Sequence, residues 1–75
     1  MKRVVDGLLY DTDSSELIYT DEDKHRKLFK TENGNFFMLF ITGEIQPKSE
    51  ESTKDYLGKY DVNKYIEIFG EPEKA

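Results

Sequence analysis

The chain has 75 residues, no cysteine, and a net charge of −5 that arises from 11 Lys and Arg against 16 Asp and Glu. This length indicates one domain over residues 1–75, and the lack of cysteine excludes disulfides, thiolate metal sites and a cysteine nucleophile. The first residues lack the apolar core of a signal peptide, and no run approaches the roughly 18 apolar residues of a membrane span. We therefore expect a soluble cytoplasmic protein.

The N-terminal residues carry the pattern of a tight β-hairpin. Asp6-Gly7 separates two short apolar runs, 4–5 and 8–10. Such a pair predicts a two-residue hairpin loop, because both of its central positions favour a positive φ. The cluster of Asp, Thr and Ser over 11–15 predicts a turn, since these side chains bond to nearby backbone amides.

A second and longer hairpin is predicted in the middle of the chain. Apolar residues predict a strand over 16–20, and the acids at 21–23 predict a turn. Residues 25–31 and 35–42 then form the two arms of a hairpin, with Asn33-Gly34 as its loop.

The register of this hairpin determines which side chains share a face. A two-residue loop would place Phe29 opposite Met38, whereas a longer loop would shift the register by one and exchange the partners. In the two-residue register, one face holds Phe29, Phe36, Met38 and Phe40, and the other holds Leu28, Phe37, Leu39 and Ile41. We expect helices to cover the first face, and either the first hairpin or another chain to cover the second.

Two short helices are predicted after Pro47, which is expected to end the strand region. Ser49 is a helix cap followed by Glu50 and Glu51, and Gly58 is a natural stop. Asp61 caps a second helix that Gly70 ends, although residues 65–69 also alternate as a strand would.

The predicted fold is therefore α+β: an antiparallel sheet of four or five short strands, followed by two short helices packed on one face. The β-sheet region covers residues 1–46 and the helical region 47–70, and residues 71–75 form a frayed tail.

Four motifs, taken in order, resemble a set of small acidic proteins from phages and mobile elements of Gram-positive bacteria. They are G-x-x-Y-D-T at 7–12, L-F-K-T-x-x-G-x-F-F at 28–37, P-x-S-E-E at 47–51 and Y-x-x-x-F-G at 65–70. The relatives often carry a longer Gly-rich segment after the Phe-rich strand, which here is cut to residues 42–46. The resemblance implies an accessory protein in a bacterial host cell. By analogy, such proteins bind and block a host defence protein, as anti-CRISPR inhibitors do.

The negative charge favours a basic partner, such as a nucleic-acid-binding defence complex. The acids expected to contact such a partner are Asp21, Glu22, Asp23, Glu50, Glu51 and Asp55. Phe37, Leu39 and Ile41 are expected to form an apolar patch that the partner or a second copy of the chain buries. A homodimeric structural or interaction module is therefore an alternative function.

The other alternative is a nucleic-acid-binding accessory protein. Arg26, Lys27 and Lys30 lie on one predicted strand, and an adjacent aromatic side chain would complete a single-strand platform. The same cations could equally protect the strand from aggregation.

We expect no enzyme, cofactor or metal site. The single histidine, His25, has no second nitrogen or sulfur ligand, and the acids near Asp11 and Asp13 lack the spacing of a calcium loop. Ser14 and Ser15 have no recognisable catalytic partners.

Overall fold

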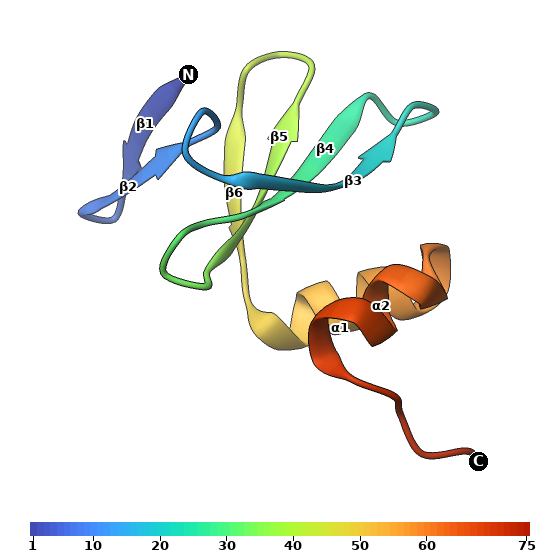
Figure 1. Cartoon of the computed structure of the whole chain (residues 1–75). Helices are drawn as coiled ribbons and strands as arrows, with labels where there is room; N and C mark the ends of the chain where they lie inside the picture. The colour runs from blue at the N-terminus through green and yellow to red at the C-terminus, as the bar shows by residue number, and fades with distance from the viewer.

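The computed structural model describes residues 1–75 as six strands followed by two helices (Figure 1). The elements are β1 (Lys2–Val5), β2 (Leu8–Asp11), β3 (Glu16–Asp21), β4 (Arg26–Lys30), β5 (Phe36–Phe40), β6 (Ile45–Lys48), α1 (Glu50–Tyr60) and α2 (Val62–Phe69). The strands form two antiparallel sheets, the hairpin β1–β2 and a four-stranded sheet in the order β3-β4-β5-β6. The predicted α+β fold with two C-terminal helices is confirmed.

The β1–β2 hairpin has the predicted two-residue loop. Asp6 has φ 51° and Gly7 has φ 78°, and Val5 lies opposite Leu8. Positive φ at both central positions is the geometry of a type I′ turn, whose twist matches that of the flanking strands. The Asp6-Gly7 prediction is therefore confirmed.

The predicted register of the β4–β5 hairpin is wrong by one residue. Phe29 lies opposite Phe37, not Met38, and Lys30 lies opposite Phe36. The amide of Gly34 donates to the carbonyl of Thr31 at 2.9 Å, and only Gly34 in this loop has a positive φ. The loop is therefore a three-residue turn with a left-handed glycine, and the extra residue shifts every cross-strand pair.

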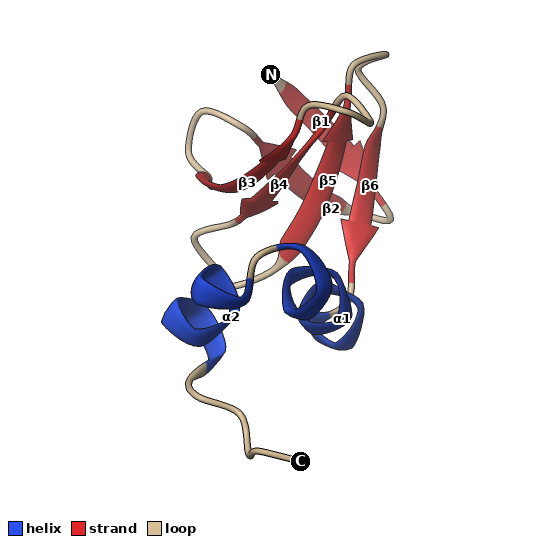
Figure 2. Cartoon of the chain, turned by 90° about the vertical axis from the view of Figure 1, so that its right-hand side faces the viewer, coloured by secondary structure: helices blue, strands red, loops and turns tan.

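This register gives each face of the sheet its own core. Ile18, Leu28, Phe36, Met38 and Leu57 pack on the helix side, whereas Tyr10, Phe29, Phe37 and Ile45 pack on the hairpin side. Figures 1 and 2 show the hairpin and the helices on opposite sides of the sheet. The helices cover Phe36, Met38 and Phe40 as expected, but Phe29 belongs to the opposite face.

The strand region extends through Pro47 to Lys48, so the prediction that Pro47 ends it is wrong. Proline is tolerated there because β6 is an edge strand. The backbone nitrogen of Pro47 can face solvent, where no hydrogen bond of the sheet requires an N–H. Ser49 caps α1 by accepting a hydrogen bond from the Ser52 amide, and Asp61 caps α2 through the Lys64 amide. Both cap predictions are confirmed, and residues 65–69 are helical.

Gly58 does not end α1, which continues to Tyr60. A Cβ added at this position would lie 3.8 Å from the Tyr65 ring, which is an ordinary contact distance. Gly58→Ala should therefore raise the free energy of unfolding by about 0.5–1 kcal/mol, because alanine restricts the unfolded chain and favours the helix. Urea denaturation of the two proteins measures this difference. A loss of stability would contradict the space found beside Tyr65.

Candidate functional site

One polar network joins the β3–β4 hairpin to α1. The carboxylate of Asp21 accepts a hydrogen bond from the Tyr56 hydroxyl at 3.0 Å and forms an ion pair with Arg26 Nε at 3.4 Å. Its other oxygen accepts from the Lys24 amide at 3.2 Å. The guanidinium of Arg26 also lies 5.2 Å from the centre of the Tyr56 ring. Asp21 therefore holds the helix against the sheet.

The network changes the proton affinity of two of its members. Burial opposes ionisation of Asp21, but the Lys24 amide, the Tyr56 hydroxyl and the Arg26 guanidinium outweigh it and lower the pKa of this carboxyl. Burial, followed by the hydrogen bond to Asp21, raises the pKa of Tyr56 to about 12. Asp21 is thus ionised and Tyr56 protonated over the whole neutral range.

Stability should fall at alkaline pH through Tyr56. Its pKa in the unfolded chain is about 10, so its contribution is complete below about pH 10 and is lost as pH rises through the folded value of about 12. Urea denaturation across this range should show a smaller pH-dependent loss for Tyr56→Phe than for wild type. Tyr60→Phe is the control, because it removes a hydroxyl that has no hydrogen-bond partner, and it should lose as much stability with rising pH as wild type does. Equal losses of stability in all three proteins would contradict this role of Tyr56.

The acids of α1 have no ion-pair partner, although lysines lie one helical turn away. Three ion pairs occur in the molecule, and their acids are Asp13, Asp21 and Glu67. Lys54 lies over the Phe69 ring at 5.2 Å, and Lys59 lies over the Tyr60 ring at 5.4 Å. These cations therefore leave Glu50, Glu51 and Asp55 unpaired and exposed.

The predicted acidic site divides into separate parts. Glu50 and Glu51 lie in the first turn of α1, and Asp55 follows Glu51 by four residues, which places both on one side of the helix. Glu22 and Asp23 are exposed in the β3–β4 turn. The adjacent Lys24 lies 6.0 Å from the Tyr60 ring, so this turn is near the opposite end of α1. Asp21 is only 11% exposed and is occupied by Arg26 and Tyr56, so it does not belong to the acidic surface.

No protein-family model, curated protein or solved structure matches this chain. Neither helix has the length and apolar character needed to cross a membrane. No group of three or more His, Cys, Asp or Glu side chains is placed to hold a metal ion.

The predicted apolar patch does not exist as one surface. Phe37 is 0% exposed, stacked on Phe29 with ring centres 5.1 Å apart and in edge contact with Tyr10. Leu39 is half-buried beside the same core, whereas Ile41 lies beyond the end of β5 and is 76% exposed. Phe37 is therefore a core residue covered by the first hairpin, whereas Ile41 is exposed at the surface.

The predicted basic strand divides its cations between the two faces of the sheet. Side chains alternate along a strand, so Arg26 and Lys30 lie on the helix side and Lys27 on the hairpin side. Arg26 is paired with Asp21, and Phe37 is too deeply buried to stack on a base. The cations and the aromatic ring of a single-strand platform are therefore not brought together.

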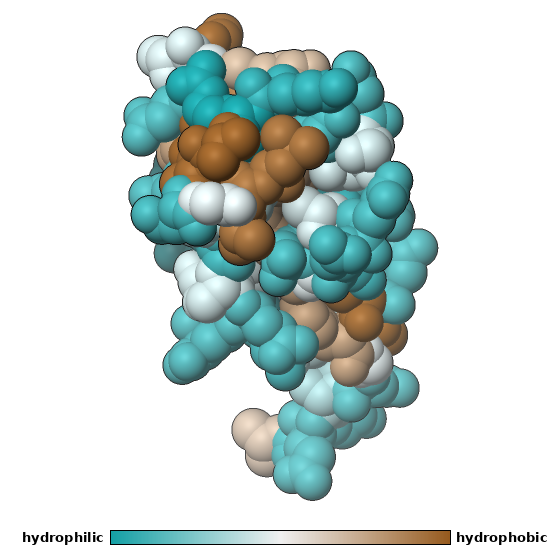
Figure 3. Space-filling view, turned by 90° about the vertical axis from the view of Figure 1, so that its left-hand side faces the viewer, coloured by the Kyte–Doolittle hydropathy of each residue, from teal (hydrophilic) through white to brown (hydrophobic).

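The apolar surface that the sequence reasoning missed lies on the first hairpin. Val4, Leu8 and Leu9 are 67%, 53% and 59% exposed. Val4 and Leu9 share the outer face of the hairpin, and we call them the hairpin patch, whereas Leu8 lies on the other face with Val5. Figure 3 shows an apolar area bordered by hydrophilic residues on this side of the molecule. The signal was present in the sequence, because a hairpin of consecutive apolar residues places half of them on its outer face.

A pocket of about 580 Å³ lies at the end of the sheet, between the β3–β4 and β5–β6 turns. Leu39, Phe40 and Ile41 supply apolar walls, and His25 and Lys27 line it as well. His25 has the left-handed backbone value φ 53°, and its ring makes no hydrogen bond. His25 is exposed, and the pocket has room for an apolar side chain of a partner.

Proposed function

We propose that this protein acts by binding a basic macromolecule through the exposed acids of α1 and the β3–β4 turn. The binding surface consists of Glu22, Asp23, Glu50, Glu51 and Asp55. The protein blocks its partner sterically and electrostatically, without turnover. The partner class is a host nucleic-acid-binding protein, and the setting implied by the sequence resemblance is a phage or mobile element that blocks a host defence complex.

The observation that carries this proposal is the separation of charge on α1. The lysines of the helix pack over aromatic rings, while its acids have neither an ion-pair partner nor cover from other residues. Uncompensated carboxylates on a rigid helix attract a basic groove and increase the rate of association at low salt.

Glu50 and Glu51 lie at the start of α1, which is about 16 Å long, and the turn acids lie near its other end. This length suits a groove that normally holds an extended, negatively charged chain. Ion pairs at such a surface are partly screened, so binding should weaken as the salt concentration rises.

The test begins with a tagged copy of the full chain, used to capture a partner from a Gram-positive bacterial lysate. The partner is identified by mass, purified and measured by calorimetry. Combined Glu50→Gln, Glu51→Gln and Asp55→Asn substitutions should weaken its binding by at least about tenfold and reduce the salt dependence. Inhibition of the partner's nucleic-acid binding should saturate at one equivalent, because a blocking protein is not a catalyst.

The matched control removes three charges elsewhere, with Glu44→Gln, Glu71→Gln and Glu73→Gln. These residues are exposed and lie outside α1 and the β3–β4 turn. Circular dichroism must show intact helices in both triple variants, since Glu50 and Glu51 also interact favourably with the helix dipole. Equal binding by both variants would remove the α1 acids from the site.

A further inference from the structure

The free strand edges of this fold are not protected in the same way. The outer strands of the four-stranded sheet carry irregularities: β3 has a register shift between Leu17 and Tyr19, and β6 contains Pro47. Bulges and prolines are common means of preventing a strand edge from pairing with another chain. β1 and β2 have neither feature, and backbone hydrogen bonds join each of them to no strand except the other.

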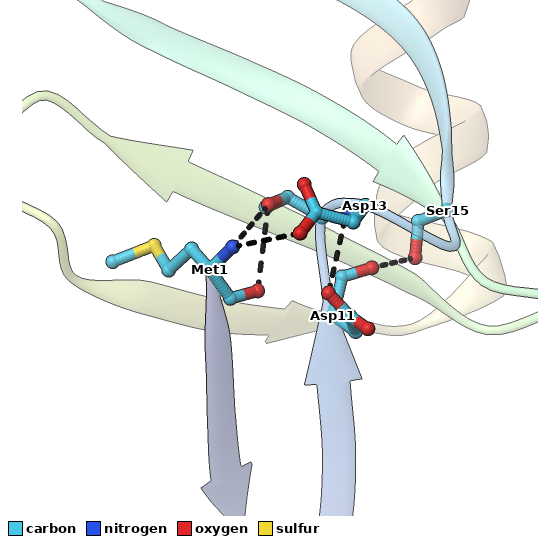
Figure 4. A network of polar contacts seen from close by, with 5 residues as sticks. Met1, Asp11, Asp13 and Ser15 are labelled. Carbon is cyan, nitrogen blue, oxygen red and sulfur yellow. Dashed lines mark hydrogen bonds and ion pairs between the residues drawn. The ribbon is translucent and has the colours of Figure 1, made fainter.

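The backbone of β1 has a defined outward side. At the base of the hairpin, the Thr12 amide donates to the Met1 carbonyl at 3.0 Å. Figure 4 shows this base, where the amino group of Met1 also lies 3.6 Å from the carboxylate of Asp13. Hydrogen-bonded pairs alternate along an antiparallel ladder, so Arg3 and Val5 bond to β2. The amides and carbonyls of Lys2 and Val4 therefore point away from β2.

This edge is complementary to itself. If two copies of β1 run antiparallel with Val4 opposite Val4, then Lys2 of each copy lies opposite Asp6 of the other. The backbone groups of Val4 point outward in both copies, so the two valines can form a hydrogen-bonded pair, whereas Asp6 lies in the turn beyond the end of β1 and contributes its carboxylate. Two Lys–Asp pairs would flank a valine contact on the two-fold axis.

The exposed side chains fit the same arrangement. Val4 lies opposite Leu9 within the hairpin, so both side chains are on its outer face. Pairing of two copies would create the row Leu9–Val4–Val4–Leu9 across four strands. The hairpin also carries two cations, Lys2 and Arg3, and two acids, Asp6 and Asp11. Its local charge therefore balances, although each chain is negative overall.

We propose that two copies of this chain pair through the outer edges of β1, to form a continuous four-stranded antiparallel sheet from their hairpins. The interface is distinct from the α1 acids, and it leaves them exposed on both copies. A dimer would thus present two acidic surfaces.

Sedimentation equilibrium of the full chain tests the proposal. Wild type should show a reversible monomer–dimer equilibrium. Val4→Pro removes an outward amide but no bond within the hairpin, and should weaken dimerisation by at least about tenfold. Val4→Thr retains both the amide and the branched side chain, and should dimerise within about threefold of wild type.

The charge pair is tested by a double-mutant cycle. Lys2→Gln and Asp6→Asn should each weaken dimerisation by about two- to fivefold, and the double variant should be no weaker than either alone. Asn is chosen because it tolerates the positive φ of Asp6. Glu73→Gln, which makes the same change of charge in the exposed C-terminal tail, should have no effect.

Hydrogen exchange on wild type supplies a test that needs no variant. The Val4 amide should become protected as protein concentration rises, while the amides at the β3–β4 turn should not change. A chain that stays monomeric at millimolar concentration overturns the proposal. A dimer that Val4→Pro does not weaken, or that forms without protection of Val4, overturns it as well.

Discussion

Phe37→Ala is expected to lower the free energy of unfolding by about 3–5 kcal/mol, a large share of the total. Phe37 is fully buried, is stacked on Phe29 and touches Tyr10 from the hairpin. Removing a buried phenylalanine ring typically costs about 3–5 kcal/mol. A domain of this length has a total stability of about 4–11 kcal/mol, so this one substitution removes a large share of it. Urea denaturation followed by circular dichroism measures the loss.

Ile41→Ala is the matched control, because Ile41 is 76% exposed and follows the same strand. It should change the free energy of unfolding by less than about 0.5 kcal/mol. A small effect of Phe37→Ala would show that the ring is not covered by the hairpin, and would restore Phe37 as a candidate contact for a partner.

Leu57→Ala is expected to detach the helices from the sheet. Leu57 is 0% exposed and is the α1 side chain within the helix-side core, where Ile18, Leu28, Phe36 and Met38 surround it. Its truncation should cost about 2–5 kcal/mol. Hydrogen exchange should show faster exchange in α1 and α2 than in β4 and β5, because the hairpin-side core is untouched.

Val62→Ala is the comparison for this variant, since Val62 is an exposed apolar residue at the start of α2. It should leave stability within about 0.5 kcal/mol of wild type. If Leu57→Ala lost as much protection from hydrogen exchange in β4 and β5 as in the helices, helix detachment would be contradicted. The protein would then unfold as one cooperative unit.

The two hairpins show how far a local signal extends. Asp6-Gly7 predicts its turn correctly, because both residues take the positive φ that a two-residue type I′ loop requires. Asn33-Gly34 predicts a turn at the right place but in the wrong register, because Glu32 joins the loop and only Gly34 takes a positive φ. One residue then moved Phe29 to the opposite face and made Phe37 a central core residue.

The candidate site was predictable to a similar extent. Composition indicated an acidic surface, and the caps Ser49 and Asp61 placed the helices that carry part of it. The sequence did not indicate that Asp21 is occupied by Arg26 and Tyr56, since Tyr56 lies 35 residues further along the chain. Nor did it indicate that Lys54 would lie over Phe69 instead of pairing with Glu50.

The amino-acid sequence by itself determined the class of fold, the positions of the turns and caps, and the sign of the surface charge. These depend on local backbone preferences and on composition, which a short window contains. Only the tertiary structure decided which face each aromatic residue occupies, which acids remain unpaired, and which strand edges are left open. Those properties depend on contacts between distant segments. In a sheet, a register shift of one residue moves every side chain of a strand to the opposite face.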